Sequence, residues 1–223
     1  MKKINCLSLV IIFSLLLPVK LLAQPLESKK GVAYTLGLNM GFASFHASVA
    51  LGETSGGGSI GKMGESFYLS KGALKDAVKH ASSINEAQNL LDLEKLNYYS
   101  TYSIGWGDGS DPSSYKGIIL PIYNDVVSIR EGFTAVLAKN SINLTNAYTL
   151  GVNISIAEGQ ATVGEAARQI VYICLTNAKA AAQALNMNLA PLNECILLAG
   201  GTTPMADLYA KIVSLRSTYQ SSF

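Results

Sequence analysis

The segment Ala33-Tyr34-Thr35-Leu36-Gly37-Leu38-Asn39 occurs a second time as Ala147-Tyr148-Thr149-Leu150-Gly151-Val152-Asn153. Only one position differs, where Val152 takes the place of Leu38. The fold depends on whether these two copies form helices or strands. Apolar alternation from Tyr148 to Ile156 is typical of a strand, because successive side chains of a strand point to opposite faces.

A helical pattern runs through the same segments and is longer. One face of a helix would carry only small or apolar residues in both copies: Leu36, Met40, Ala43, Ala47 and Ala50 in the first, and Leu150, Ile154, Ala157 and Ala161 in the second. The pattern persists for about four turns, longer than a typical strand. It therefore favours helices.

Two further pairs of segments match in the same order along the chain. Tyr68, Lys75 and Ala77 correspond to Tyr172, Lys179 and Ala181, and Tyr123 to Phe133 corresponds to Tyr209 to Tyr219. Colinear matches predict an internal duplication, with a first repeat at 24–142 and a shorter second repeat at 143–223. The offset falls from 114 to 104 to 86 residues, so the first copy is longer. Its surplus falls in Gly52–Glu65 and Tyr99–Lys116, which we expect to be Gly- and Ser-rich inserted loops.

Apolar residues at helical spacing predict further helices at 70–97, with a break near residues 82–85, and at 121–139, 163–186, 191–199 and 204–219. Pro121 suits the first turn of its helix. The predicted fold is all-α: each half supplies about four helices, and the halves pack as one bundle about a pseudo-two-fold axis. Strands in the Ala-Tyr-Thr-Leu-Gly segments would instead make the fold α+β.

Residues 1–23 have the pattern of a secretory signal peptide. Lys2 and Lys3 precede an apolar run from Leu7 to Val19, and Ala23 suits the position before a cleavage site. The run is too short to span a bilayer as a helix, and no later segment reaches 18 uninterrupted apolar residues. We therefore expect a mature chain that begins at Gln24, has no transmembrane helix and is extracytoplasmic, either periplasmic or secreted.

The charge of the mature chain excludes one class of partner. Removing residues 1–23 takes away Lys2, Lys3 and Lys20 and no acidic residue, so 14 basic residues remain against 15 acidic ones. The formal net charge falls from +2 to about −1. No basic surplus remains to drive binding to nucleic acid.

The cysteines and histidines give no chemical signature. If 163–186 and 191–199 form an antiparallel pair of helices, Cys174 and Cys195 are displaced from each other by about 10 Å along the helix axes. This displacement favours buried thiols over a disulfide. His46 and His80 have no Cys or acidic cluster at ligand spacing around them.

Two loop segments approach known ion-binding motifs and fall short of them. The run from Gly56 to Met63 resembles a phosphate-binding loop, but Met63 stands where the motif needs Ser or Thr. Asp108 to Asp111 lacks the spacing of a calcium-binding EF-hand loop. The sequence thus predicts no catalytic set, no metal site and no cofactor.

The repeat suggests one ligand site. Tyr34 and Asn39 correspond to Tyr148 and Asn153, and these four residues would line a central cleft if the repeated segments face each other. Equally, they could be hydrogen-bonded core residues. Arg130 and Arg216 also correspond, and each could anchor an anion or form a salt bridge between helices.

These observations favour an exported, non-enzymatic helical module that binds a partner protein or a small ligand. Two alternatives stay open. One is an extracytoplasmic enzyme, such as a hydrolase, whose catalytic residues are scattered along the chain. The other is a structural protein associated with the cell envelope.

Overall fold

The computed structural model describes residues 28–84, 93–105 and 111–223, and the regular structure of these residues is helical. In chain order the helices are α2 (Lys29–Glu53), α3 (Ile60–Ala81), α5 (Leu93–Thr101), α6 (Lys116–Asn140), α7 (Ile142–Val163), α8 (Arg168–Ala184), α9 (Ala190–Gly200) and α10 (Met205–Gln220). Short 3₁₀ turns at Pro112–Tyr115 and Glu165–Ala167 precede α6 and α8. The all-α prediction is confirmed, because both copies of the repeated segment lie within helices, α2 and α7.

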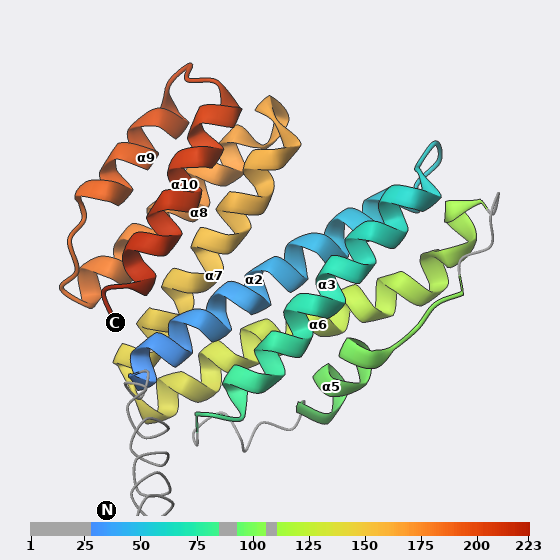
Figure 1. The fold of residues 1–223 in the computed structure, drawn as a ribbon, viewed down its shortest axis with the longest axis horizontal. Helices are drawn as coiled ribbons and strands as arrows, with labels where there is room; N and C mark the ends of the chain where they lie inside the picture. The colour runs from blue at the N-terminus through green and yellow to red at the C-terminus, as the bar shows by residue number, and fades with distance from the viewer. Residues whose placement is uncertain (1–27, 85–92, 106–110) are drawn as a thin grey trace, which may run out of the picture.

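The helices form two arms that meet at an angle (Figure 1). One arm contains α2, α3, α5 and α6, and the other contains α8, α9 and α10, with α7 running from the junction into it. Helix α2 contacts α3, α6 and α7, and helix α7 contacts α8, α10 and α2. Phe223 packs at the junction of the arms, where its ring centroid lies 5.2 Å from that of Tyr34.

Helices α2 and α7 approach each other closely at Gly37 and Gly151. A Cβ atom added to Gly37 would overlap the carbonyl oxygen of Tyr148, and one added to Gly151 would overlap that of Tyr34. Only glycine lets the two backbones come this close. The matched glycines of the repeated segment therefore let α2 and α7 pack closely at the junction of the arms.

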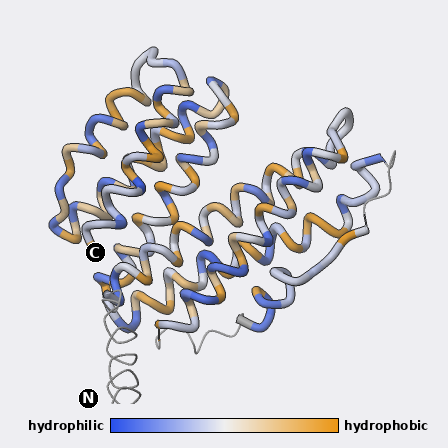
Figure 2. The backbone as a smooth tube through the Cα atoms, in the orientation of Figure 1, coloured by the Kyte–Doolittle hydropathy of each residue, from blue (hydrophilic) through white to orange (hydrophobic). Residues whose placement is uncertain are grey.

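Hydrophobic and hydrophilic residues follow one another along most helices, as Figure 2 shows. Helix α2 is different, because it is covered by α3, α6 and α7 and buries residues on several sides, among them Tyr34, Leu36, Met40, Ala43 and Ala47. A helix surrounded in this way needs no single apolar stripe. Helix α7, which carries the strand-like alternation from Tyr148 to Ile156, is covered in a similar way by α2, α8 and α10.

Helix α3 begins earlier than the sequence pattern predicted. Only Thr54–Ser59 are non-helical within the predicted Gly52–Glu65 loop. The Ser59 side chain accepts a hydrogen bond from the Lys62 N–H, and Met63 and Phe67 then bury their side chains in the core. This burial offsets the helix cost of Gly61 and Gly64, about 1 kcal/mol each.

The other helix boundaries also differ in part from the prediction. The predicted break near residues 82–85 agrees with the end of α3 at Ala81, and α5 begins at Leu93, after residues 85–92, which lie outside the described residues. Pro121 lies inside α6 rather than in its first turn. The carbonyl it leaves unpaired belongs to exposed Gly117, where water can bond it. Helix α8 begins only at Arg168, because Gly164 has a positive φ of 97° and ends α7.

Two further predictions concern the thiols and the membrane. Cys174 in α8 and Cys195 in α9 are buried free thiols, as expected. No helix in the described part of the chain combines the length and the apolarity that crossing a membrane requires.

Candidate functional site

The two repeated tyrosines are core residues with satisfied hydroxyls. The Tyr34 hydroxyl donates a hydrogen bond to the Arg216 carbonyl oxygen over 3.1 Å, and the Tyr148 hydroxyl donates to the Arg130 carbonyl oxygen over 2.8 Å. Neither side chain is exposed, and burial raises the pKa of both phenols far above the ordinary value. Both tyrosines remain protonated and tie α2 to α10 and α7 to α6.

The two repeated asparagines face different neighbours. The Asn39 amide nitrogen lies 3.4 Å from His80 Nδ1 of α3, whereas the Asn153 amide donates to the Thr149 carbonyl oxygen over 2.8 Å. Asn153 also lines a shallow cavity between α7 and α8. The structure therefore does not bring Asn39 and Asn153 into contact with the two tyrosines, and ligand binding by these four residues stays a prediction.

Arg216 lies in a cluster that contains its own counter-ion. Its guanidinium is 3.1 Å from Glu158 Oε1 of α7 and stacks over the Phe42 ring of α2, 5.6 Å from the ring centroid. Glu158 is 5% exposed, and within the described chain its second oxygen, Oε2, has no hydrogen-bond partner. Burial raises the pKa of Glu158, and the positive charge of Arg216 opposes that shift. The expected salt bridge between helices therefore exists at Arg216.

Arg130 lies in a different environment. Arg130 lines a cavity of about 130 Å³ between α2, α6 and α7, together with Ser44, Phe45, Ser48, Tyr123, Val127, Ile156 and Gln160. The residues that line this cavity include no carboxylate. The ion pair that Arg130 makes is with Glu131 of its own helix, over 3.6 Å, and the Glu131 side chain is 71% exposed. Such a pair contributes little, because solvent screens it.

The offset of the repeated segment relates the two arginine environments. At an offset of 114 residues, Ser44 corresponds to Glu158, and at an offset of 86 residues Arg130 corresponds to Arg216. The position on α2 that corresponds to Glu158 therefore carries serine, a short hydroxyl side chain, in place of a carboxylate. Both Ser44 and Ser48 donate their hydroxyl hydrogens to backbone carbonyl oxygens of α2, over 2.7 Å each.

Sequence reasoning named both arginines and missed Ser44 and Glu158. The signal was present, because the offset of 114 extends beyond Asn39 and Asn153 without a gap in either helix. What could not be inferred was that position 158 on α7 meets position 216 on α10. That contact depends on how the helices pack.

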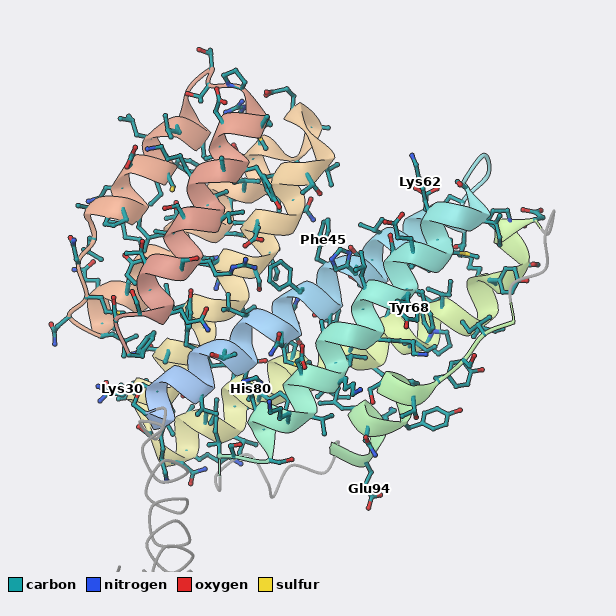
Figure 3. All side chains as sticks on the ribbon, in the orientation of Figure 1. Lys30, Phe45, Lys62, Tyr68, His80 and Glu94 are labelled. Atoms are coloured by element: carbon teal, nitrogen blue, oxygen red, sulfur yellow. The ribbon has the colours of Figure 1, made fainter. Side chains whose placement is uncertain are left out.

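The remaining candidates do not come together as a chemical centre. His46 packs edge-on against Phe45, with the ring centroids 5.0 Å apart, and burial lowers its pKa. His80 Nδ1 lies 2.7 Å from the Asp76 carbonyl oxygen of its own helix. Figure 3 shows Phe45 in the angle between the two arms and His80 near the end of α3. Among the described residues no group of His, Cys, Asp or Glu is arranged to hold a metal ion.

The two loop motifs have structural roles. Lys62 is exposed in the first turn of α3, where Figure 3 shows it pointing outward, and Met63 is fully buried. Asp111 accepts hydrogen bonds from Ser113 and caps the turn before α6. Residues 108–110 of the segment compared with an EF-hand loop lie outside the described residues.

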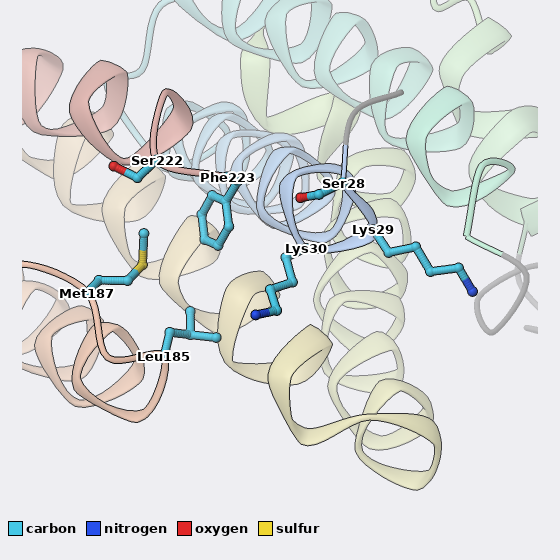
Figure 4. Close-up of a pocket in the computed structure, with 7 residues that line it drawn as sticks. All are labelled: Ser28, Lys29, Lys30, Leu185, Met187, Ser222 and Phe223. Atoms are coloured by element: carbon cyan, nitrogen blue, oxygen red, sulfur yellow. The ribbon is translucent and has the colours of Figure 1, made fainter. Parts of the chain in front are cut away.

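A larger cavity, of about 400 Å³, lies where the two ends of the described chain meet (Figure 4). It is lined by Lys30, Met187 and Phe223 among others. This cavity borders the first described residue and does not carry the candidate site.

Exposed apolar side chains recur at corresponding positions of α3 and α8. Tyr68 is 74% exposed and Leu69 46%, while Tyr172 is 37% exposed and Ile173 48%. These two pairs correspond at the offset of 104 residues. Exposed apolar pairs of this kind are features of interaction surfaces when they form a patch.

Comparison with known proteins gives no matching family model, no matching curated protein and no matching solved structure.

Proposed function

We propose that this chain is an exported, non-enzymatic helical module that binds a small ligand in the cavity at Arg130. The observation that carries the proposal is the difference between the two matched arginines. Arg216 has a buried carboxylate partner, whereas Arg130 lines a cavity without one. Buried or half-buried charges in proteins are normally paired, so a cavity beside an arginine that lacks a buried partner favours a bound anion.

The groups at the cavity favour holding a ligand over transforming it. A guanidinium has N–H donors and no acceptor atom, so Arg130 can supply hydrogen bonds and charge to a ligand but cannot act as a general base. The Ser44 and Ser48 hydroxyls donate to backbone carbonyls, and the residues that line the cavity include no His, Asp, Glu or Lys that could activate a serine as a nucleophile. These features support a binding role.

We propose that the module arose by duplication, with repeats at 24–142 and 143–223 arranged about a pseudo-two-fold axis. The colinear sequence matches support this origin. The reciprocal contacts add support, since each repeat's tyrosine donates to the carbonyl of the other repeat's arginine. The helix contacts follow the same order in both halves, because α2 packs on α3 and α6 as α7 packs on α8 and α10.

Export is proposed from the sequence of residues 1–23, which predicts a signal peptide and a mature chain that begins at Gln24. N-terminal sequencing of the protein from its own host tests this part of the proposal. We expect the sequence to begin at Gln24. An N-terminus at Met1 in the cytoplasmic fraction would contradict it.

Thermal unfolding of the mature chain tests the binding role. We expect the low-molecular-mass extract of the host's extracytoplasmic fraction to raise the melting temperature of the dialysed protein, because a ligand that binds only the folded state stabilises it. The rise should disappear in Arg130→Gln and persist in Lys62→Gln, which removes an exposed cation of α3. No rise in the wild type, or an equal rise in Arg130→Gln, would contradict the proposed role.

A partner protein is the second candidate, and the recurrence of exposed Tyr68-Leu69 and Tyr172-Ile173 favours it. A photo-crosslinking residue at position 69 or 173 should then give the same protein adduct in the living host. The same group at exposed Lys79 serves as the control. Adducts of equal yield at all three positions would argue against a specific surface.

A further inference from the structure

We propose that the ligand of the Arg130 cavity is a small monocarboxylate, whose carboxylate group takes the place beside Arg130 that the Glu158 side chain holds beside Arg216. This inference rests on the proposed binding role and names the class of ligand. It follows from a comparison of the two arginine environments within one chain.

The second half of the chain shows which group satisfies this kind of arginine. At Arg216 the partner is a carboxylate, carried on the central helix α7 and buried next to the guanidinium. At Arg130 the corresponding residue of the central helix α2 is Ser44, which is also buried. Serine has a much shorter side chain than glutamate, and a cavity of about 130 Å³ lies beside it.

The charge at the cavity suits a single negative charge. Arg130 is the one cationic residue among those that line it, and Gln160 and Tyr123 are the neutral side chains there that can donate further hydrogen bonds. A guanidinium pairs well with the planar, two-oxygen carboxylate group. A dianion such as phosphate would keep an unbalanced negative charge in a partly buried site, which is costly.

The rest of the lining restricts the remainder of the ligand. Phe45, Val127 and Ile156 present apolar surface to the cavity, so a short aliphatic tail fits beside the carboxylate. A cavity of this volume holds only a few non-hydrogen atoms. Such small ligands have limited affinity, so we expect a Kd of about 1 mM for acetate and tighter binding for propionate or butyrate.

The test is a titration of the ¹⁵N-labelled mature chain with sodium acetate, propionate and butyrate at constant ionic strength, followed by NMR. Sodium chloride and inorganic phosphate are the comparison anions. We expect saturable shifts at residues of α2, α6 and α7 around Arg130 with the carboxylates only. Arg130→Gln should weaken binding at least tenfold, and Lys62→Gln should leave it unchanged.

Two exchanges between the halves sharpen the test. Ser44→Glu supplies the carboxylate from within the chain and should abolish carboxylate binding at Arg130. Glu158→Ser removes it from the second half and should create a second carboxylate site at Arg216. The spectra of each variant show whether it is folded, and Arg130→Gln keeps the proposal testable if an exchange prevents folding.

The outcomes separate this inference from the proposed function. Carboxylate shifts that survive in Arg130→Gln and Ser44→Glu would overturn the inference, and so would stronger binding of phosphate. If no carboxylate binds but the host extract still stabilises the wild type and not Arg130→Gln, the ligand class is wrong and the binding role stands. If neither the carboxylates nor the extract acts through Arg130, both proposals fall.

Discussion

Gly37 of α2 and Gly151 of α7 lie on opposite sides of one helix crossing, and each faces a backbone carbonyl of the other helix. The carbonyl opposite Gly37 belongs to Tyr148, and the carbonyl opposite Gly151 belongs to Tyr34. The same two tyrosines send their hydroxyls to the Arg130 and Arg216 carbonyls. The crossing therefore joins the arms and positions the two arginine-bearing helices.

Adding a methyl group at this crossing should destabilise the protein. For Gly37→Ala or Gly151→Ala we expect a loss of about 1–3 kcal/mol in the free energy of unfolding, because the new Cβ meets backbone atoms that no rotamer change can move. Urea unfolding followed by circular dichroism measures it. The control is Gly72→Ala at an exposed position of α3, where nothing lies within 4 Å of the added Cβ. This substitution should raise the free energy of unfolding by up to about 1 kcal/mol. Equal effects at all three positions would show that the crossing is looser than described.

The buried tyrosine hydroxyls should each contribute measurably to stability. Tyr148→Phe leaves the Arg130 carbonyl without this donor, and we expect a loss of about 1–2 kcal/mol. Tyr34→Phe should cost a similar amount through the Arg216 carbonyl. Tyr68→Phe, at a hydroxyl on a largely exposed ring, should change the free energy of unfolding by less than about 0.5 kcal/mol. If Tyr148→Phe leaves the free energy of unfolding unchanged, water replaces the lost donor.

The buried glutamate predicts a specific pH dependence. Burial raises the pKa of Glu158, so the folded protein binds its proton more tightly than the unfolded chain does. Stability from this group is then fully present below the ordinary glutamate pKa of 4.5 and is lost as the pH rises above it through the folded-state pKa. The wild type should therefore lose stability relative to Glu158→Gln over this range, measured by urea unfolding at several pH values.

Glu165 provides a control of the opposite sign. Hydrogen bonds from Arg168 lower the pKa of Glu165, so its contribution to stability is present above 4.5 and is lost as the pH falls through the folded-state value. The wild type should gain stability relative to Glu165→Gln as the pH rises through the range just below 4.5. If both variants show the same slope against pH, Glu158 is better solvated than its burial indicates.

The two thiols should be unreactive in the folded protein. Burial is the main cause that raises the pKa of both Cys174 and Cys195 to about 11, so little thiolate is present at neutral pH. We expect a thiol-specific reagent to label neither cysteine quickly in the native mature chain and to label both after denaturation. Labelling of fewer than two thiols in denatured, unreduced protein would reveal a disulfide.

The helical class could be predicted from the sequence because both copies of the repeated segment keep a small, apolar face over several turns. The start of α3 could not, since Gly61 and Gly64 disfavour a helix locally and the burial of Met63 and Phe67 decides the matter. Pro121 was placed in a first turn by its local preference, yet the turn from Pro112 to Tyr115 lets α6 begin upstream of it.

The sequence identified the two arginines of the candidate site but not the residues that surround them. Arg130 and Arg216 were identified as a matched pair, but their partners lie on other helices. Glu158 and Ser44 have no local motif that marks them, and the tyrosine hydroxyls bond to backbone carbonyls, which every residue has. The offset of 114 residues matches Ser44 with Glu158, but the packing of α2 and α7 against their neighbours decides which side chains these two residues meet.

The contrast between Glu158 and Ser44 has a consequence for when each arginine is neutralised. A carboxylate attached to the same fold stands beside Arg216 at a high effective concentration, which dilution of the surroundings cannot change. On the proposal made above, the partner of Arg130 arrives from solution, so its occupancy follows the carboxylate concentration outside the cell membrane. Arg216 would then keep its intramolecular partner at every carboxylate concentration, whereas the Arg130 cavity would be half occupied when the carboxylate concentration equals the Kd.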